Sequence, residues 1–201
     1  MDVLPSSVIA DRLQICEWTE ADVGPLDTAI ATSIEHLRPW MPWIAFEPVS
    51  REDRLDRIKA WHVDRSIGGD AVYGIFLDGT IVGGTGFHRR IGDGGLEIGY
   101  WIHVDHVRRG YARETSRALT ITAFEQPEID RVEIHHDRGN EPSGRVAKSL
   151  GFTFVEEVPR EAEAPAETGV HWIWRITRDE FEASSPGAAA SRTSGARTVH
   201  R

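Results

Sequence analysis

The stretch that decides the fold is Leu96-Glu-Ile-Gly-Tyr-Trp-Ile-His-Val-Asp-His-Val-Arg-Arg-Gly-Tyr-Ala-Arg-Glu114. Its first part alternates in the manner of a strand, which we expect over Leu96–Val104. A short loop with two arginines follows, and a helix is expected over Arg109–Glu125. Backbone N–H groups at a helix N-terminus lack intrahelical partners, and the helix dipole makes that end positive. The order of strand, loop and helix start therefore predicts a cradle for a pyrophosphate.

The residues of the loop agree with this interpretation but do not prove it. Gly110 lets the backbone approach a ligand closely, Ala112 adds little bulk, and Arg108 and Arg109 add positive charge. The loop is not a P-loop, because the Gly-Lys-Ser/Thr ending is missing, and the G-x-G-x-x-G series of dinucleotide-binding proteins is absent. An ordinary surface loop with solvated arginines is the alternative that this stretch leaves open.

Strands precede the stretch, and strands alternate with helices after it. The dipeptide Asp78-Gly79 predicts a tight hairpin, and a glycine-rich turn at 92–95 leads into Leu96–Val104. This mixed order predicts an α+β domain with a central, largely antiparallel sheet and helices on both faces. The remaining strands are expected at 12–18, 71–77, 80–88, 131–136, 152–158 and 170–176, and the remaining helices from 19 towards 36, after 50, and at 141–150.

Length and composition fit one soluble domain. The chain has 201 residues, of which 40% are hydrophobic and 27% are charged, with a net charge of −9. This acidic balance argues against general nucleic-acid binding, which depends on cationic side chains. It agrees with a cationic partner such as an amine, although solubility explains an acidic surface equally well.

The cysteine count, the hydropathy and the two ends of the sequence predict the cellular location and the bounds of the domain. A single cysteine, Cys16, excludes an internal disulfide framework and is expected in the core. No uncharged apolar stretch approaches the roughly 20 residues that span a bilayer, and the N-terminus does not resemble a signal peptide, so we expect a cytoplasmic protein with no membrane partner. Residues 184–201 combine Ser, Ala and Gly with three arginines, which predicts a disordered basic tail after a domain over 1–183.

A second motif lies downstream, in Asn140-Glu-Pro-Ser143 and Leu150-Gly-Phe152. Asn140 is a favoured N-cap, and Pro142 suits a first helical turn. Gly151 suits the position just after a helix. Each feature alone is ordinary helix punctuation.

Together with the first motif, these residues resemble a family. Arg108-Arg-Gly-Tyr-Ala112 after a strand, followed by Asn140-x-x-Ser143 and Leu150-Gly-Phe152, resembles the GNAT superfamily of acetyl-CoA-dependent N-acetyltransferases. Within it, His36-Leu-Arg-Pro-Trp-Met-Pro-Trp43 and Glu97-Ile-Gly-Tyr-Trp101 are similar to the RimJ/RimL branch. That branch includes enzymes acting on the N-termini of ribosomal proteins and many acting on small amines. The resemblance covers roughly residues 10–180.

The resemblance implies a three-layer fold whose sheet is splayed between its fourth and fifth strands, Leu96–Val104 and Arg131–His136. Acetyl-CoA, the co-substrate, would lie in that opening. Its pantetheine arm would pair with the backbone of the fourth strand, as an added strand does. The residues implied in cofactor binding are Ile102 and Val104 for the pantetheine, Arg108, Arg109, Gly110, Tyr111 and Ala112 for the pyrophosphate, and Asn140 for the pantetheine or acyl region.

The sequence departs from the family pattern in two places. The first position of the phosphate motif is Val107, which removes one contact but leaves the backbone amides. Many members also carry a tyrosine that protonates the departing thiolate, and the aligned residue here is Ala147. Ser143 is the substitute that the RimL-like branch implies, and a water is the alternative. The missing tyrosine keeps open a second hypothesis, a non-catalytic acyl-CoA-binding module of the same fold.

The implied reaction is direct attack of a primary amine on the thioester, without a covalent intermediate. Glu97 is the candidate base, acting directly or through a water, and a purely structural carboxylate is the alternative. Backbone N–H donors on the same strand would bind the oxyanion, where Gly99 is compatible with a bulge. The acceptor would be a small amine or a protein N-terminus.

Three further residues are assigned to the acceptor side. Trp40 and Trp43 are expected to wall the acceptor pocket, although aromatic packing explains them equally. His88 would line this pocket or act as an alternative base, and a strand-end histidine without a role is the alternative.

His135 and His136 are adjacent on a strand and point to opposite faces, so no metal site is expected. Homodimers are common in the family, but the sequence itself does not indicate one.

Overall fold

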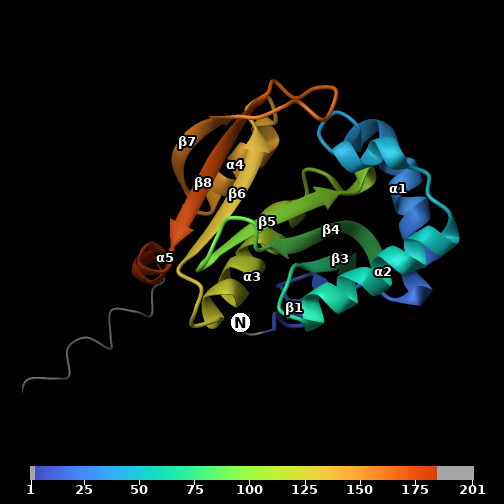
Figure 1. Cartoon of the computed structure of the whole chain (residues 1–201), viewed down its shortest axis with the longest axis horizontal. Helices are drawn as coiled ribbons and strands as arrows, with labels where there is room; N and C mark the ends of the chain where they lie inside the picture. The colour runs from blue at the N-terminus through green and yellow to red at the C-terminus, as the bar shows by residue number, and fades with distance from the viewer. Residues whose placement is uncertain (1–2, 185–201) are drawn as a thin grey trace, which may run out of the picture.

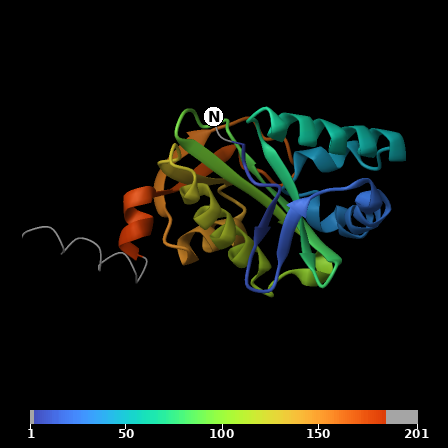
Figure 2. The ribbon, with the colours of Figure 1, turned by 90° about the horizontal axis from the view of Figure 1, so that it is seen from below.

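The computed structural model describes residues 3–184. They form one eight-stranded sheet in the order β1-β2-β3-β4-β5-β6-β8-β7, with helices on both faces (Figures 1 and 2). The predicted α+β class is confirmed. The strands are β1 Ser7–Ile9, β2 Gln14–Glu17, β3 Ala71–Leu77, β4 Thr80–His88, β5 Gly95–Ile102, β6 Arg131–Asp137, β7 Thr153–Pro159 and β8 Val170–Thr177. The helices are α1 Val23–Leu37, α2 Arg51–Ser66, α3 Tyr111–Glu125, α4 Glu141–Ser149 and α5 Arg178–Ser184, with 3-10 turns η1 Glu20–Asp22, η2 Pro42–Phe46 and η3 Val104–His106.

The alternation along each strand divides the side chains between two cores. Ile98 of β5 and Phe87 of β4 are paired and lie in the cluster beneath α3 and α4. Trp101 of β5 packs against the other cluster, which α1 and α2 cover. Successive residues of a strand point to opposite faces, so Glu97 and Gly99 share the α1–α2 face with Trp101, whereas Tyr100 shares the α3–α4 face.

The sheet splays where the resemblance implied. β4 and β5 are antiparallel and stay paired from His88↔Glu97 to Gly83↔Ile102. β5 and β6 are parallel and pair only over Gly95↔Arg131, Leu96↔Val132 and Glu97↔Glu133. Beyond Glu97 the two strands diverge, and the two halves of the sheet form the V seen in Figure 1.

Three local predictions were wrong. β1 was missed, because three residues are too few to show a pattern, so the predicted fourth strand is the fifth. That strand ends at Ile102 and not at Val104, because the His103 side chain accepts a hydrogen bond from the Asp105 N–H and begins η3. No bulge occurs at Gly99, since the pairing of β5 with β4 is continuous.

α5 was not predicted, and it extends to the first residue of the expected tail. Residues 185–201 of that tail lie outside the described residues. Within residues 3–184, no helix combines the length and the apolar character needed to cross a membrane.

Candidate active site

The splay exposes one backbone edge of β5. The His103 N–H donates to the Val82 carbonyl at 2.9 Å, so the odd-numbered residues of this antiparallel pair bond to β4. By the same alternation, the N–H and C=O groups of Ile98, Tyr100 and Ile102 face the side from which β6 has diverged. This edge can accept an extended ligand as a further strand would be accepted.

The predicted phosphate loop leads away from this edge. Gly110 has φ 84° and ψ 3°, a left-handed conformation that favours glycine, and it is the N-cap of α3. The first hydrogen bond of α3 runs from the Glu114 N–H to the Gly110 carbonyl at 3.0 Å. The N–H groups of Tyr111, Ala112 and Arg113 come before it and therefore have no partner within the helix. Arg108, Arg109 and Gly110 are exposed. The loop thus offers backbone donors, cationic side chains and access to an anion.

Arg12, which lies just before β2, contacts this loop and the first turn of α3. Its guanidinium donates to the Arg109 carbonyl at 3.2 Å and pairs with Glu114 at 2.7 Å. It also stacks 4.8 Å from the centre of the Tyr111 ring. These contacts hold the start of α3 in place.

Two hydroxyl groups meet on the α3–α4 face of the opening. The Tyr100 hydroxyl of β5 lies 2.9 Å from Ser143 Oγ of α4. Burial raises the pKa of Tyr100 to about 12, against which the Ser143 hydrogen bond acts weakly. The phenol is therefore protonated at neutral pH and can supply a proton through Ser143.

The position of Ser143 follows from the start of α4. Asn140 is the N-cap, as predicted, and its side chain accepts a hydrogen bond from the Ser143 N–H at 3.4 Å. Gly151, with φ 84°, follows the helix, also as predicted. Ala147 is fully buried, so the position of the family tyrosine contributes only packing.

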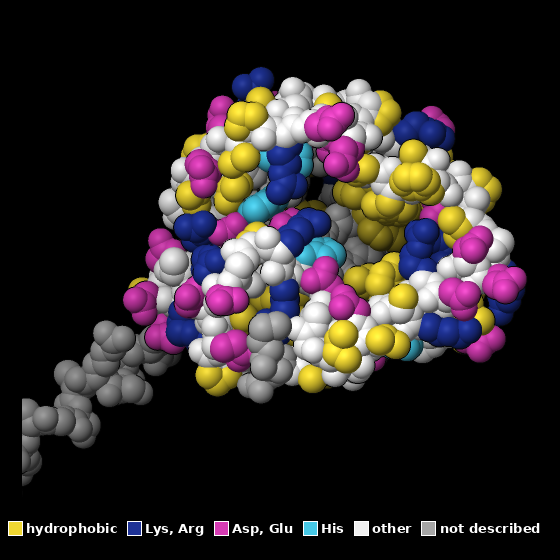
Figure 3. All heavy atoms as spheres, viewed as in Figure 1, with side chains coloured by type: hydrophobic (Ala, Val, Ile, Leu, Met, Phe, Trp, Pro, Cys, Tyr) yellow, Lys and Arg dark blue, Asp and Glu magenta, His cyan; other side chains and the backbone are white. Residues whose placement is uncertain are grey.

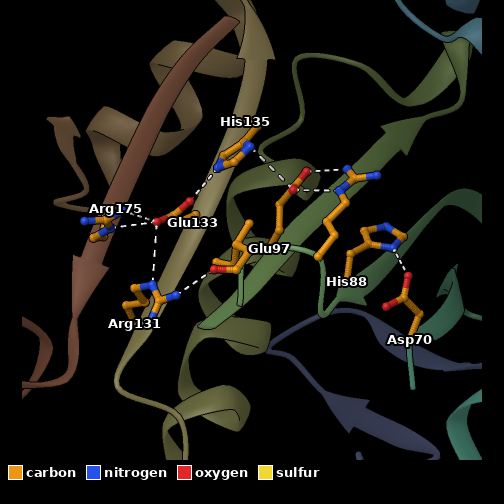
Figure 4. A network of polar contacts seen from close by, with 9 residues as sticks. Asp70, His88, Glu97, Arg131, Glu133, His135 and Arg175 are labelled. Carbon is orange, nitrogen blue, oxygen red and sulfur yellow. Dashed lines mark hydrogen bonds and ion pairs between the residues drawn. The ribbon is translucent and has the colours of Figure 1, made fainter. Parts of the chain in front are cut away.

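Glu97 lies on the opposite face, in a network of charges (Figure 4). Its carboxylate is 3% exposed and accepts two hydrogen bonds from Arg90, one of them at 2.7 Å from Nε. His135 of β6 lies beside it, with Nδ1 3.5 Å from Glu97 Oε2. Burial raises the pKa of Glu97, but the hydrogen bond and charge of Arg90 and the charge of His135 hold it below its ordinary value. Glu97 is therefore an ionised, firmly held carboxylate.

His135 continues this network across the splay. Its Nε2 is 2.5 Å from Glu133 Oε2, and Glu133 in turn accepts a hydrogen bond from Arg175 Nε of β8 at 2.6 Å. His136 points to the other face, where its Nε2 accepts from Trp174 Nε1 at 3.0 Å. The two adjacent histidines thus face apart, as the strand geometry predicts.

His88 forms a second polar pair on the same face (Figure 4). Its Nδ1 lies 2.6 Å from Asp70 Oδ2, and the other oxygen of Asp70 accepts from the Arg89 N–H at 2.8 Å. His88 Nε2 lies over Gly99: a β-carbon placed on Gly99 would be 3.2 Å from it. The absence of a side chain at residue 99 lets the imidazole reach the mouth of the splay.

Two tryptophans around the start of η2 lie near the two halves of the splayed sheet. The Trp43 ring of η2 lies 6.1 Å from the Trp101 ring of β5. Trp40 reaches the other half of the sheet, since a β-carbon on Gly139 would be 3.2 Å from its Cη2. Figure 3 shows this face hollowed in its centre, with hydrophobic side chains on one side and arginine and histidine on the other.

The structure thus places Ser143 on the α3–α4 face of the splayed sheet and Glu97 and His88 on the other face. Sequence reasoning gave no role to Tyr100, although it lies in the quoted Glu97–Trp101 motif. It also missed Asp70 and Arg90, which are acidic and basic residues in turns without any motif. Among residues 3–184, no group of three or more His, Cys, Asp or Glu side chains is arranged to hold a metal ion.

Comparison with known proteins identifies the family. Residues 12–153 match the family model described as the acetyltransferase (GNAT) domain. The chain belongs to the GNAT acetyltransferase family. Over 80 residues it is 35% identical to "Putative ribosomal N-acetyltransferase YdaF" of Bacillus subtilis (strain 168), a match that spans 39% of this chain and only 44% of that relative.

Solved structures of the same fold are similar along most of the chain. RimL, a ribosomal L7/L12 alpha-N-protein acetyltransferase in complex with coenzyme A, has a TM-score of 0.76 at 18% identity and covers 89% of this chain and 99% of its own. The microcin C7 self-immunity acetyltransferase MccE, in complex with acetyl-CoA and AMP, has a TM-score of 0.77 at 18% identity, with 87% and 98% covered. RimJ of Mycobacterium smegmatis, in complex with a CoA-disulfide, has a TM-score of 0.73 at 19% identity, with 87% of each chain covered. At these identities the likeness establishes the fold.

Proposed function

We propose that this protein transfers the acetyl group of acetyl-CoA to a primary amine of a small molecule or a protein N-terminus. One observation carries the proposal: β6 leaves β5 after Glu97, and the edge this exposes runs from the Tyr100–Ser143 hydroxyl pair towards the start of α3 at Gly110. The proton donor, the strand edge and the anion cradle follow one another in the order of the thioester, the pantetheine and the pyrophosphate of an acyl-CoA.

Backbone groups would bind the pyrophosphate and the pantetheine of acetyl-CoA. The pyrophosphate would be held by the amides from Arg108 to Ala112, and the pantetheine by the exposed edge at Ile102. Val104 would contribute its carbonyl, because its N–H donates to Ser33 Oγ at 3.2 Å. Asn140, whose side chain caps α4 beside Ser143, would border the acyl end.

In the proposed reaction, groups on the two faces of the sheet act on the amine and on the thiolate. The acetyl oxygen would be stabilised by the N–H groups of Ile98 or Tyr100, which point into the opening. An amine arriving from the α1–α2 face would meet Glu97 and His88, the two candidate proton acceptors. The thiolate would then leave on the α3–α4 face, where Ser143, backed by Tyr100, supplies its proton. The Tyr100 hydroxyl thereby provides, from β5, the phenol that is missing at Ala147.

The proposed acceptor site lies on the α1–α2 face, opposite the Tyr100–Ser143 pair. Trp40 and Trp43 would wall the acceptor site, because Trp40 lies near Gly139, beyond the end of β6, and Trp43 lies beside Trp101 of β5. The named relatives act on the alpha-amine of ribosomal proteins or confer self-immunity to a microcin, so both a peptide and small amines deserve testing.

The test is release of free CoA thiol from acetyl-CoA with a panel of amines. The panel should contain a hexapeptide with N-terminal serine, spermidine and glucosamine, with mass spectrometry to locate the acetyl group. An acetylated amine in at least one arm supports the proposal. Binding of acetyl-CoA in calorimetry without thiol release in any arm would instead favour the non-catalytic acyl-CoA-binding module.

A further inference from the structure

We propose that His88, positioned by Asp70, is the group that takes the proton from the attacking amine. This inference rests on the proposed function, and it selects one of the two candidate proton acceptors that the site contains.

The contact with Asp70 sets the tautomer. A carboxylate can only accept, so the 2.6 Å contact between Asp70 Oδ2 and His88 Nδ1 requires that Nδ1 carry the proton. The neutral ring then has its lone pair on Nε2. Burial alone would raise the pKa of Asp70, but hydrogen bonds from His88 and the Arg89 N–H keep it below its ordinary value. The carboxylate is thus ionised and keeps Nε2 free to accept a proton.

The place of Nε2 fits an amine in attack. It lies over Gly99, two residues beyond Glu97, the last residue of β5 that pairs with β6. Tyr100 and Ser143 lie on the opposite face of the sheet. In acyl transfer the amine adds to one face of the thioester carbon, and the sulfur then leaves the tetrahedral carbon. The nitrogen and the sulfur are separate substituents of that carbon, so a base on one face of the sheet and an acid on the other can serve them separately.

Glu97 is less suited to this task because its oxygens are already used. Arg90 donates to both of them, and His135 Nδ1 lies 3.5 Å from Oε2. Two carboxylates, Asp70 and Glu97, interact with His88 through their charge, and Arg90 pairs with Glu97. Glu97 would therefore stabilise positive charge without receiving the proton.

In this reaction the amine nitrogen loses two protons and the sulfur gains one. The ammonium gives one proton to solvent, and the neutral amine attacks the thioester carbon. As the N–C bond forms, the nitrogen passes a second proton to His88 Nε2. The C–S bond breaks with its electron pair on sulfur, which takes a proton from the Tyr100–Ser143 pair. Solvent exchange then returns the proton of the imidazolium to that pair, so one proton is released for each amide formed.

The first test is the pH dependence of kcat/KM with the best amine of the panel. In the wild-type protein, the rate should rise with pH along an acidic limb. The H88N variant should lose that limb and fall about 100-fold or more, within the usual range for a general base. Its affinity for acetyl-CoA should stay within about twofold. The E97Q variant should keep the limb, and the control H62N, on α2, should match the wild type.

The second test reads the tautomer directly. Nitrogen-15 NMR of the wild-type protein should show His88 protonated at Nδ1 at neutral pH, and the D70N variant should shift the proton to Nε2 and lose at least tenfold in kcat/KM. A merely structural Asp70 would not move the proton. The proposal is overturned by an Nε2-protonated ring in the wild type, by H88N activity within threefold, or by loss of the limb in E97Q alone. A wild-type protein that acetylates no amine overturns the proposed function itself.

Discussion

The hydroxyl groups of Tyr100 and Ser143 lie 2.9 Å apart, although 43 residues separate them in the chain. They come from β5 and α4, and they meet where β6 has left β5. The pair places a buried, protonated phenol behind a serine that borders the opening. In the proposed reaction this is the source of the proton for the thiolate.

Removing the serine hydroxyl should slow turnover more than binding. We expect S143A to lower kcat by about 10-fold or more, in the range for a positioned acid, with acetyl-CoA affinity within about twofold. Y100F should lower kcat as well, and the double variant should lose less than the sum of the two single losses in free energy, because the hydroxyls act as one unit. Steady-state kinetics and calorimetry measure both quantities. S149A, near the far end of α4, is the control; unchanged turnover in S143A would remove Ser143 from the mechanism.

A side chain on the phosphate loop should block the cofactor. Gly110 has φ 84° and precedes the amides that would hold the pyrophosphate, so G110E adds both strain and a negative charge there. We expect acetyl-CoA binding to fall below detection in calorimetry. The control is G79E, at a hairpin glycine with φ 79° and open space around it. Equal affinities of G110E and the wild type would refute the phosphate cradle.

Truncation of Trp40 should affect the amine and spare the thioester. Trp40 lies near Gly139, beyond the end of β6, and in the proposal it walls the site of the amine. We expect W40A to raise the KM for the amine by about 10-fold, as the loss of a buried aromatic contact implies, with acetyl-CoA affinity unchanged. W172A, on the other face of β8, serves as the control. A larger effect on acetyl-CoA than on the amine would contradict this assignment.

Asp137 should stabilise the fold only when it is ionised. Its buried carboxylate accepts hydrogen bonds from the N–H groups of Gly139 and Thr168 at 2.7 Å each, which joins the end of β6 to the loop before β8. Burial raises its pKa, but these bonds hold it below the ordinary value of 3.8. We expect D137N to cost about 2 kcal/mol in urea unfolding at pH 7.

The pH dependence of that cost has a definite sign. A depressed pKa means that the stabilisation is fully present above pH 3.8 and is lost as the pH falls through the lower, folded-state pKa. Wild type and D137N should therefore converge in strong acid. A difference that stays constant down to pH 2 would show that the charge of Asp137 is not what holds the loop.

The pattern of initial-rate plots tests direct attack. Amine and thioester are expected to be bound together, so initial-rate plots against one substrate at fixed levels of the other should intersect. Parallel lines would indicate a covalent acyl-enzyme, for which Cys16 is the available thiol. Burial raises the pKa of that thiol, which makes it a poor nucleophile.

Local signals in the sequence determined much of the framework. The hairpin at Asp78-Gly79, the caps at Ser50, Asn140 and Gly151, and the loop before α3 are set by residues within a few positions of one another. Turn and cap preferences act over that range, so β3, β4 and α4 were predicted to within about a residue, and the start of α2 was predicted as well. β1 and α5 were missed because short elements depend on what they pack against.

Only the tertiary structure decided which side chains work together. Asp70 and His88 are 18 residues apart and meet because β3 and β4 pair in one register. Tyr100 and Ser143 meet because α4 packs on one face of the splayed sheet, and Glu97 meets Arg90 and His135 on the other. The strand alternation fixed the face of each residue in advance. The partner on that face depends on long-range packing, which a pattern of neighbouring residues does not contain.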